Sequence, residues 1–203
     1  ANNIPIKRRS STIVFGDYEY KSGLASFLKN MYINLIKFID KREEWEKDLW
    51  DVRNLEQYGI TYNKSCHEHN LDFEKINNLE IRKEVKKYMK QRLIANNKFS
   101  WASAYNYMKY IPLFINFISE LEPTWIDLKN LGRQHILKYI EWLNIYAKDN
   151  PRRRNTNHKV YIRASLNCIQ KFLSDIKLRE YDIAPTKNIR VLIFPEDKPK
   201  VSK

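Results

Sequence analysis

The most informative stretch of this 203-residue chain is residues 156–176, TNHKVYIRASLNCIQKFLSDI. Its apolar residues recur every three or four positions, which is the spacing of one buried face of an α-helix. They are Ile162, Leu166, Ile169, Leu173 and Ile176. A second face is polar and contains no acid, with Lys159, Arg163, Asn167 and Gln170. We therefore predict a helix that is buried on one side and capped by Asn155 or Thr156.

The residues just before this helix are strongly basic. The sequence Asn150-Pro151-Arg152-Arg153-Arg154-Asn155 leads into it, and no Asp or Glu occurs between residues 150 and 174. Clustered Lys and Arg displace counterions from nucleic-acid phosphates, and a helix N-terminus offers N–H groups to a phosphate. Arg and Asn side chains also suit bidentate contacts to base edges. We predict that this loop holds the DNA backbone while the helix faces a groove. The predicted DNA-binding residues are Arg152, Arg153, Arg154, Asn155, Asn157, Lys159, Arg163 and Asn167, together with Ser103 and Lys109 of an earlier helix.

The rest of the chain also favours helices. Apolar spacing predicts helices over residues 100–121, with Ser100 as the N-cap, and over residues 133–147. Pro112 lies inside the first of these and predicts a kink or a break. Similar spacing predicts helices near residues 24–39 and 79–93, whereas residues 15–20 alternate loosely like a strand, and residues 48–53 fit a short strand or a packed turn. The fold class is therefore mainly α, with a small α(+β) N-terminal region before a bundle of four to five helices.

The helical pattern breaks at Asn96-Asn97-Lys98, which sets the main predicted domain boundary. We expect a basic arm over residues 1–20, an accessory domain over residues 21–95, the helical bundle over residues 96–185 and a linker over residues 186–203. Lys7, Arg8 and Arg9 of the arm either follow phosphates or a minor groove, or belong to a flexible terminus.

Charge is unevenly distributed. Lys and Arg number 37 against 24 Asp and Glu, which gives a formal net charge of +13. Residues 1–99 carry +5, residues 100–150 carry none, and residues 151–203 carry +8. Such asymmetry favours a polyanionic partner, nucleic acid before an anionic membrane, although lysines that only keep a surface soluble are the simpler alternative.

Other classes of protein find little support. No apolar run approaches the roughly 18 residues of a membrane span, and no signal-peptide core is evident, so an intracellular, cytoplasmic protein is expected. Cys66 and Cys168 make no disulfide framework. Cys66-His67-Glu68-His69 resembles half a zinc site but has no second pair, so no metal is predicted. His135 and His158 are interpreted as surface or capping groups, and the five Trp as core or interface anchors. No glycine-rich phosphate loop, hydrolase motif or zinc-protease motif occurs, so no cofactor or small-molecule substrate is predicted.

The second half of the chain resembles a known family. Ser100-x-x-Ser103-x-x-x-Tyr107 followed by Phe114-Ile115-x-Phe117 is similar to the first helix of the SAM-like core-binding domain of phage integrases, the tyrosine recombinases. The second and third blocks of that domain resemble Leu128-x-x-Leu131-x-Arg133-x-His135-Ile136-x-x-Tyr139-Ile140-x-x-Leu143, and then Asn155-Thr156-Asn157 with Phe172-Leu173. Phe194-Pro195-Glu196-Asp197-Lys198-Pro199-Lys200 looks like the linker to the catalytic domain. The match covers about residues 78–203. Upstream, Asp48-Leu49-Trp50-Asp51-Val52-Arg53 and Arg82-x-x-Val85-Lys86-x-Tyr88 look similar to the extra N-terminal region of transposon-type integrases.

The resemblance implies a two-domain clamp on double-stranded DNA, in which this chain covers one face for DNA integration or transposition. In this family a catalytic tyrosine attacks a phosphodiester, while arginines and histidines stabilise the charge that develops. Those residues are expected beyond Lys203, because the sequence contains no His-x-x-Arg and none of its 13 tyrosines can be nominated as the nucleophile. The nearest match, His135-Ile136-Leu137-Lys138, lies in an apolar-striped helix. The chain itself is therefore expected to cleave no DNA, and other recombinase protomers on paired sites are expected partners.

Two alternatives share part of this evidence. A stand-alone helical DNA-binding regulator would use the same basic helix and would bind a palindrome as a symmetric dimer. A protein-interaction module would carry its lysines only for solubility, and any DNA affinity would be indifferent to Arg152, Arg153 and Arg154.

Overall fold

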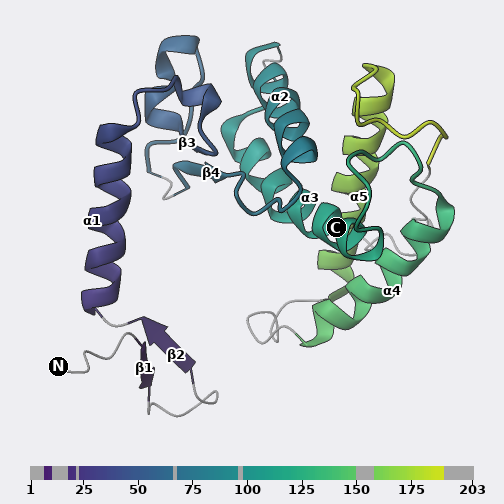
Figure 1. Ribbon diagram of the computed structural model, residues 1–203, viewed down its shortest axis with the longest axis horizontal. Coiled ribbons are helices and arrows are strands. Elements are labelled where there is room, and N and C mark those ends of the chain that lie inside the picture. The colour runs from purple at the N-terminus through teal and green to yellow at the C-terminus, as the bar shows by residue number, and fades with distance from the viewer. Residues whose placement is uncertain are drawn as a thin grey trace, which may run out of the picture. The chain divides into compact units, whose positions relative to one another are not determined.

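The computed structural model describes residues 7–10, 18–21, 23–65, 68–95, 98–149 and 158–189. The chain divides into two compact units, residues 1–43 and residues 44–203. Figure 1 shows that helices dominate the described residues and that strands are few and short. The prediction of a mainly α fold with a small β contribution is therefore confirmed.

The first unit holds a strand pair and a helix. Strand β1 (Lys7–Ser10) runs antiparallel to β2 (Tyr18–Lys21), with Lys7 opposite Lys21 and Ser10 opposite Tyr18. Helix α1 (Gly23–Ile39) follows, close to the predicted range of 24–39. Lys7, Arg8 and Arg9, which the sequence assigns to a basic arm, form most of strand β1, and their predicted contact with DNA remains a prediction. Pairing with β2 supplies the backbone partners that a single arm would lack.

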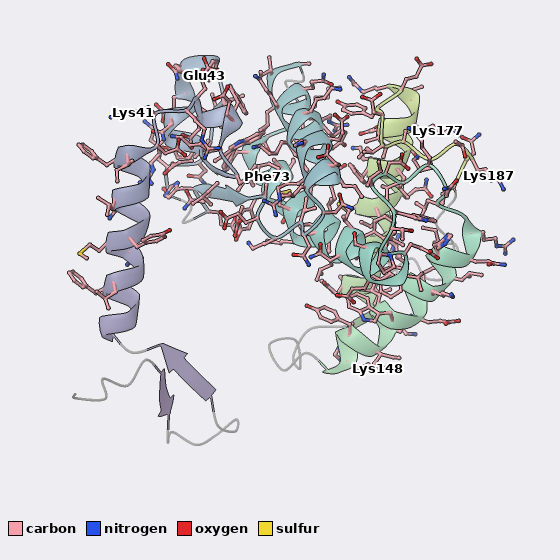
Figure 2. The ribbon with its side chains drawn as sticks, viewed as in Figure 1. Lys41, Glu43, Phe73, Lys148, Lys177 and Lys187 are labelled. Carbon is pink, nitrogen blue, oxygen red and sulfur yellow. The ribbon has the colours of Figure 1, made fainter. Side chains whose placement is uncertain are left out.

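The second unit begins with a small β element that packs around tryptophan. Strand β3 (Leu49–Asp51) pairs with β4 (Asn70–Asp72), and one-turn 3-10 helices lie at Glu44–Glu46 (η1), Val52–Asn54 (η2) and Glu56–Tyr58 (η3). Residues 48–53 thus contain both a short strand and a tight turn. Trp50 is fully buried, with ring centroids 4.8 Å from Trp45 and 4.5 Å from Phe73. Figure 2 labels Phe73, whose side chain is also fully buried.

Four long helices complete this unit. They are α2 (Leu79–Ala95), α3 (Trp101–Leu121), α4 (Arg133–Asp149) and α5 (His158–Leu178). Helix α3 is central, because it packs against α2, α4, α5 and strand β4 (Figure 1). The predicted tryptophan anchors agree with this core: Trp45, Trp50 and Trp101 are buried, and Trp125 and Trp142 pack against it partly buried.

Side chains define where three of these helices begin. The Asn78 Oδ1 atom accepts the Ile81 N–H at 3.1 Å before α2. The Ser100 Oγ atom accepts the Ser103 N–H at 3.3 Å, which confirms Ser100 as the N-cap of α3. At α4, the His135 Nδ1 atom accepts the Gly132 N–H at 3.0 Å, so His135 acts as a capping group, as predicted. Each contact satisfies a donor that a helix N-terminus leaves without an intrahelical partner.

Helix α3 continues through Pro112, so the predicted possibility of a break is wrong. A proline inside a helix removes one hydrogen bond and crowds the carbonyl four residues earlier. Pro112 is buried here, and its neighbours Ile111, Phe114 and Ile115 are fully buried. Their packing on both sides of the proline holds the helix together despite the lost bond.

Helix α2 is fastened to α5 by a buried ion pair. The Arg92 guanidinium of α2 contacts the Asp175 carboxylate of α5, and the Tyr88 hydroxyl donates to the same carboxylate at 2.9 Å. The guanidinium also lies over the Phe99 ring, 4.4 Å from its centroid. Residues 44–95 and the helical bundle thus belong to one compact unit. The predicted domain limits at residues 20/21, 95/96 and 185/186 remain predictions.

Helix α5 ends in a left-handed residue, after which the chain folds back. Glu180 has φ of 54°, and the Tyr181 N–H bonds to the Ile176 carbonyl at 3.0 Å, which is the pattern of a Schellman cap. The following segment bonds to the connection before α4 through Thr186 and Lys129. Lys177 and Lys187, labelled in Figure 2, lie on α5 and on this returning segment.

Candidate nucleic-acid interface

The two faces of α5 differ sharply in chemistry. Its buried face consists of Tyr161, Ser165, Leu166, Ile169, Phe172, Leu173 and Ile176. Ile162, which the sequence placed in the same stripe, is only partly buried but packs against the core. The buried hydroxyl of Ser165 is satisfied by the Tyr139 hydroxyl of α4 at 3.2 Å. The buried stripe predicted for this helix is therefore confirmed, and it fixes which side chains point outward.

The outward face carries a polar row at intervals of four residues. Lys159 and Asn167 are exposed, and Arg163 between them is partly exposed. The row continues to Lys171, which is also exposed and which the sequence-based list omitted. Lys171 could have been predicted from its position four residues after Asn167, because residues four apart are neighbours on a helix surface. Gln170 lies beside this row, and its amide donates to Ser174 and to the Ile189 carbonyl, at 2.9 and 3.2 Å.

The remaining members of the predicted site fall in three places. Arg152, Arg153, Arg154, Asn155 and Asn157 lie outside the described residues, directly before the first residue of α5. Lys7, Arg8 and Arg9 belong to β1 in the other unit. Ser103 and Lys109 both lie on α3.

Helix α3 carries both Ser103 and Lys109 and packs against α5. The ring of Tyr110, the next residue, lies 5.5 Å from the ring of Tyr161 in the first turn of α5. Lys109 is half-exposed, bonds to the Asn106 side chain at 3.1 Å and lies 3.9 Å from the Glu68 carboxylate. Ser103 instead bonds to the Ser100 hydroxyl at 3.1 Å, at the start of α3. Both residues remain predicted DNA-binding residues.

Helix α2 is the other lysine-rich helix, but most of its cations pair with carboxylates of the same unit. Arg82 and Lys86 both pair with Asp48, at 3.1 and 3.0 Å. Burial opposes ionisation of Asp48, but the hydrogen bonds and charges of Lys86 and Arg82 outweigh it and hold the pKa of that carboxyl below its usual range. Further along α2, Lys83 pairs with Glu80 at 2.7 Å and Lys87 with Glu84 at 3.5 Å. A large share of the positive charge of α2 is therefore balanced by nearby carboxylates, whereas the sequence of α5 has no carboxylate before Asp175.

Other chemistry is not evident in the described part of the chain. No group of three or more potential metal-ligating side chains occurs there; Cys66 and His67 of the half metal motif lie outside it. Burial raises the pKa of the Cys168 thiol to about 12, which keeps it protonated at neutral pH. No helix among the described residues has the length and apolar character that crossing a membrane requires.

Comparison with known proteins points to mobile genetic elements. The chain is similar to transposase B from transposon PsiTn554 of Staphylococcus aureus, at 29% identity over 159 residues, which covers 78% of this chain and 23% of that protein. It is also similar to transposase B from transposon Tn554 of S. aureus strains N315 and Mu50, at 28% identity over 193 residues and 95% of this chain. The chain spans about a quarter of the length of these relatives. No protein-family model matches the chain, and no solved structure matches it significantly.

Proposed function

We propose that this chain binds double-stranded DNA in a transposition reaction, as the DNA-binding region of a transposon-encoded recombinase of the tyrosine type. The outward face of α5 is the observation that carries the proposal. It presents Lys159, Arg163, Asn167 and Lys171 from one rigid helix, and the basic residues 152–154 lie four residues or more before the first residue of that helix in the sequence. Similarity to transposases encoded by two transposons supports a role in DNA transposition.

Each part of this surface has a distinct role in the proposal. Arg152, Arg153 and Arg154, with Lys159, neutralise phosphates and fix the position of the chain on the duplex. Arg163 and Asn167 lie further along the helix, where side chains can reach base edges in the major groove. Lys171 and Lys109 extend the phosphate contacts at the borders. Strand cleavage is assigned to catalytic residues outside this chain, and assembly with other protomers on paired sites is part of the proposal.

Binding to duplex DNA over a series of salt concentrations tests the proposal. We expect the logarithm of the association constant to fall linearly with the logarithm of salt concentration, by about 0.9 for each phosphate contact. Arg152→Ala/Arg153→Ala/Arg154→Ala and Lys159→Ala/Arg163→Ala should both flatten that slope, by about two to three and about two contacts respectively. Fluorescence anisotropy of a labelled duplex measures both slopes.

The matched control removes two lysines from α2. Lys83→Ala/Lys87→Ala changes the net charge as much as Lys159→Ala/Arg163→Ala does, but at side chains that pair with Glu80 and Glu84. We expect it to leave the slope nearly unchanged. Equal losses in both double variants would mean that binding follows net charge alone. If the wild-type chain shows no salt-dependent binding, a protein-interaction module becomes the better explanation.

A further inference from the structure

Helix α1 carries an apolar surface that is exposed among the described residues. Leu28, Met31, Leu35 and Phe38 are 48%, 55%, 54% and 76% exposed, and Phe27, Tyr32 and Ile39 beside them are 60–63% exposed. A large apolar side chain exposed to this degree contributes roughly 100 Å², so the seven together present roughly 700 Å². Patches of this size exceed what most monomeric proteins expose, and they mark interaction sites.

The spacing of these residues indicates that the partner is another helix. Leu28, Met31, Leu35 and Phe38 are separated by three, four and three residues, and Leu24 extends the series by four in the other direction. Alternating intervals of three and four are the a and d positions of a heptad repeat, which form the contact line of two packed helices. No charged residue occupies any of these positions.

A second copy of α1 is the occupant that matches this surface best. In the described part of the 44–203 unit, the large exposed apolar residues are dispersed over several elements, and no helix repeats them at heptad spacing. Leu137 and Ile145 of α4, for example, are separated by the exposed Glu141. By contrast, α1 supplies a complementary apolar line by itself. A two-fold pair of α1 helices would bury at most about 700 Å² on each partner, a little below the roughly 800 Å² of a standard interface.

We propose that this chain self-associates through the apolar face of α1. The helix has 17 residues, which is fewer than three heptads, so the pair is expected to be weak, with a dissociation constant of about 1–100 µM. Such an affinity leaves the free chain largely monomeric when dilute and brings two chains together when their local concentration rises. The proposal concerns α1 and does not depend on DNA binding by α5.

Sedimentation velocity of the whole chain over that concentration range tests the proposal. We expect a concentration-dependent monomer–dimer equilibrium. Leu28→Glu/Leu35→Glu should raise the dissociation constant at least about tenfold, because it would place carboxylates in an apolar contact. The matched control is Ile126→Glu/Leu178→Glu, which changes two equally apolar, exposed residues of the other unit and should leave the equilibrium unchanged. A wild type that remains monomeric throughout, or a dimer that both double variants weaken equally, overturns the proposal.

Oxidative crosslinking gives a second, independent readout. Met31 is a d position at the midpoint of α1, so it faces its own copy in a parallel, in-register helix pair. Met31→Cys, in a chain that also carries Cys66→Ser, should therefore form a disulfide-linked dimer, whereas Leu178→Cys in the same background should not. Failure of Met31→Cys to crosslink while the wild type dimerises would place the interface elsewhere. Duplex binding by Leu28→Glu/Leu35→Glu distinguishes failure of this proposal from failure of the proposed function. If this variant no longer dimerises but still binds duplex DNA with the wild-type salt dependence, the change concerns α1 alone.

Discussion

Removal of the Asp175 carboxylate is expected to be among the most damaging single changes in the 44–203 unit. Asp175→Ala would leave the Arg92 guanidinium, whose side chain is 8% exposed, without its carboxylate, and the Tyr88 hydroxyl without its acceptor. Breaking a buried ion pair from one side costs about 3–5 kcal/mol, and the lost hydroxyl bond adds about 1 kcal/mol. The Asp175 side chain is 20% exposed, so water can reach part of the site and the lower end applies. We therefore expect a loss of about 3–4 kcal/mol in the free energy of unfolding.

Urea unfolding measures this loss, with tryptophan fluorescence reporting on the core and circular dichroism on the helices. With a slope of about 2 kcal/mol per molar urea, the midpoint should fall by about 1.5–2 M. Tyr88→Phe should account for about 1 kcal/mol of the total. Asp182→Ala is the control, because Asp182 is exposed and forms no ion pair with the described residues; it should stay within about 0.5 kcal/mol of wild type. If Asp175→Ala costs less than about 1 kcal/mol, the carboxylate does not hold Arg92 and the reasoning is refuted.

Three further predictions concern other parts of the same unit. Glu180→Gly should stabilise the chain by about 0.5–1 kcal/mol, read as a higher melting temperature, because glycine adopts the φ of 54° without strain; an unchanged or lower value would contradict this. Lys171→Ala should flatten the salt dependence of duplex binding by about one contact, or 0.9 in slope, while Lys83→Ala should not. Because the pKa of Asp48 is lower in the folded chain than its unfolded value of about 3.8, this carboxyl stabilises the fold at pH values above 3.8. That contribution disappears as the pH falls through the folded pKa. Asp48→Asn should therefore lower stability at neutral pH and weaken its fall in acid, measured by urea unfolding from pH 7 to about 3.

The helices could be predicted from the sequence because each carries its own local evidence. The stripe from Leu166 to Ile176, the Ser100 cap and the spacing in residues 133–147 all lie within single elements, and the structure confirms each. Pro112 shows the limit of such reasoning, since local chemistry predicts a kink or a break there. Packing by residues from other helices decides that α3 continues, and a local pattern does not report it.

The pairing of charges could not be predicted, because the partners are far apart in the chain. Arg82 and Lys86 find Asp48 more than 30 residues away, and Arg92 finds Asp175 83 residues away. From the sequence, the lysines of α2 look as available to a polyanion as those of α5. The three-dimensional contacts show that Arg82, Lys83, Lys86 and Lys87 of α2 pair with carboxylates.

The ion pair between α2 and α5 also has a consequence for how such chains can be recombined in evolution. An exchange at residue 96 would join a foreign α2 to the native α5 and would leave Asp175 facing whatever residue replaced Arg92. A neutral residue in place of Arg92 would leave the mostly buried carboxylate of Asp175 without a cationic partner, and an acidic residue there would repel it. Residues 44–95 are therefore expected to be inherited together with the helical bundle, and viable crossovers are expected in the connection before Glu44 rather than at the sequence break that follows α2.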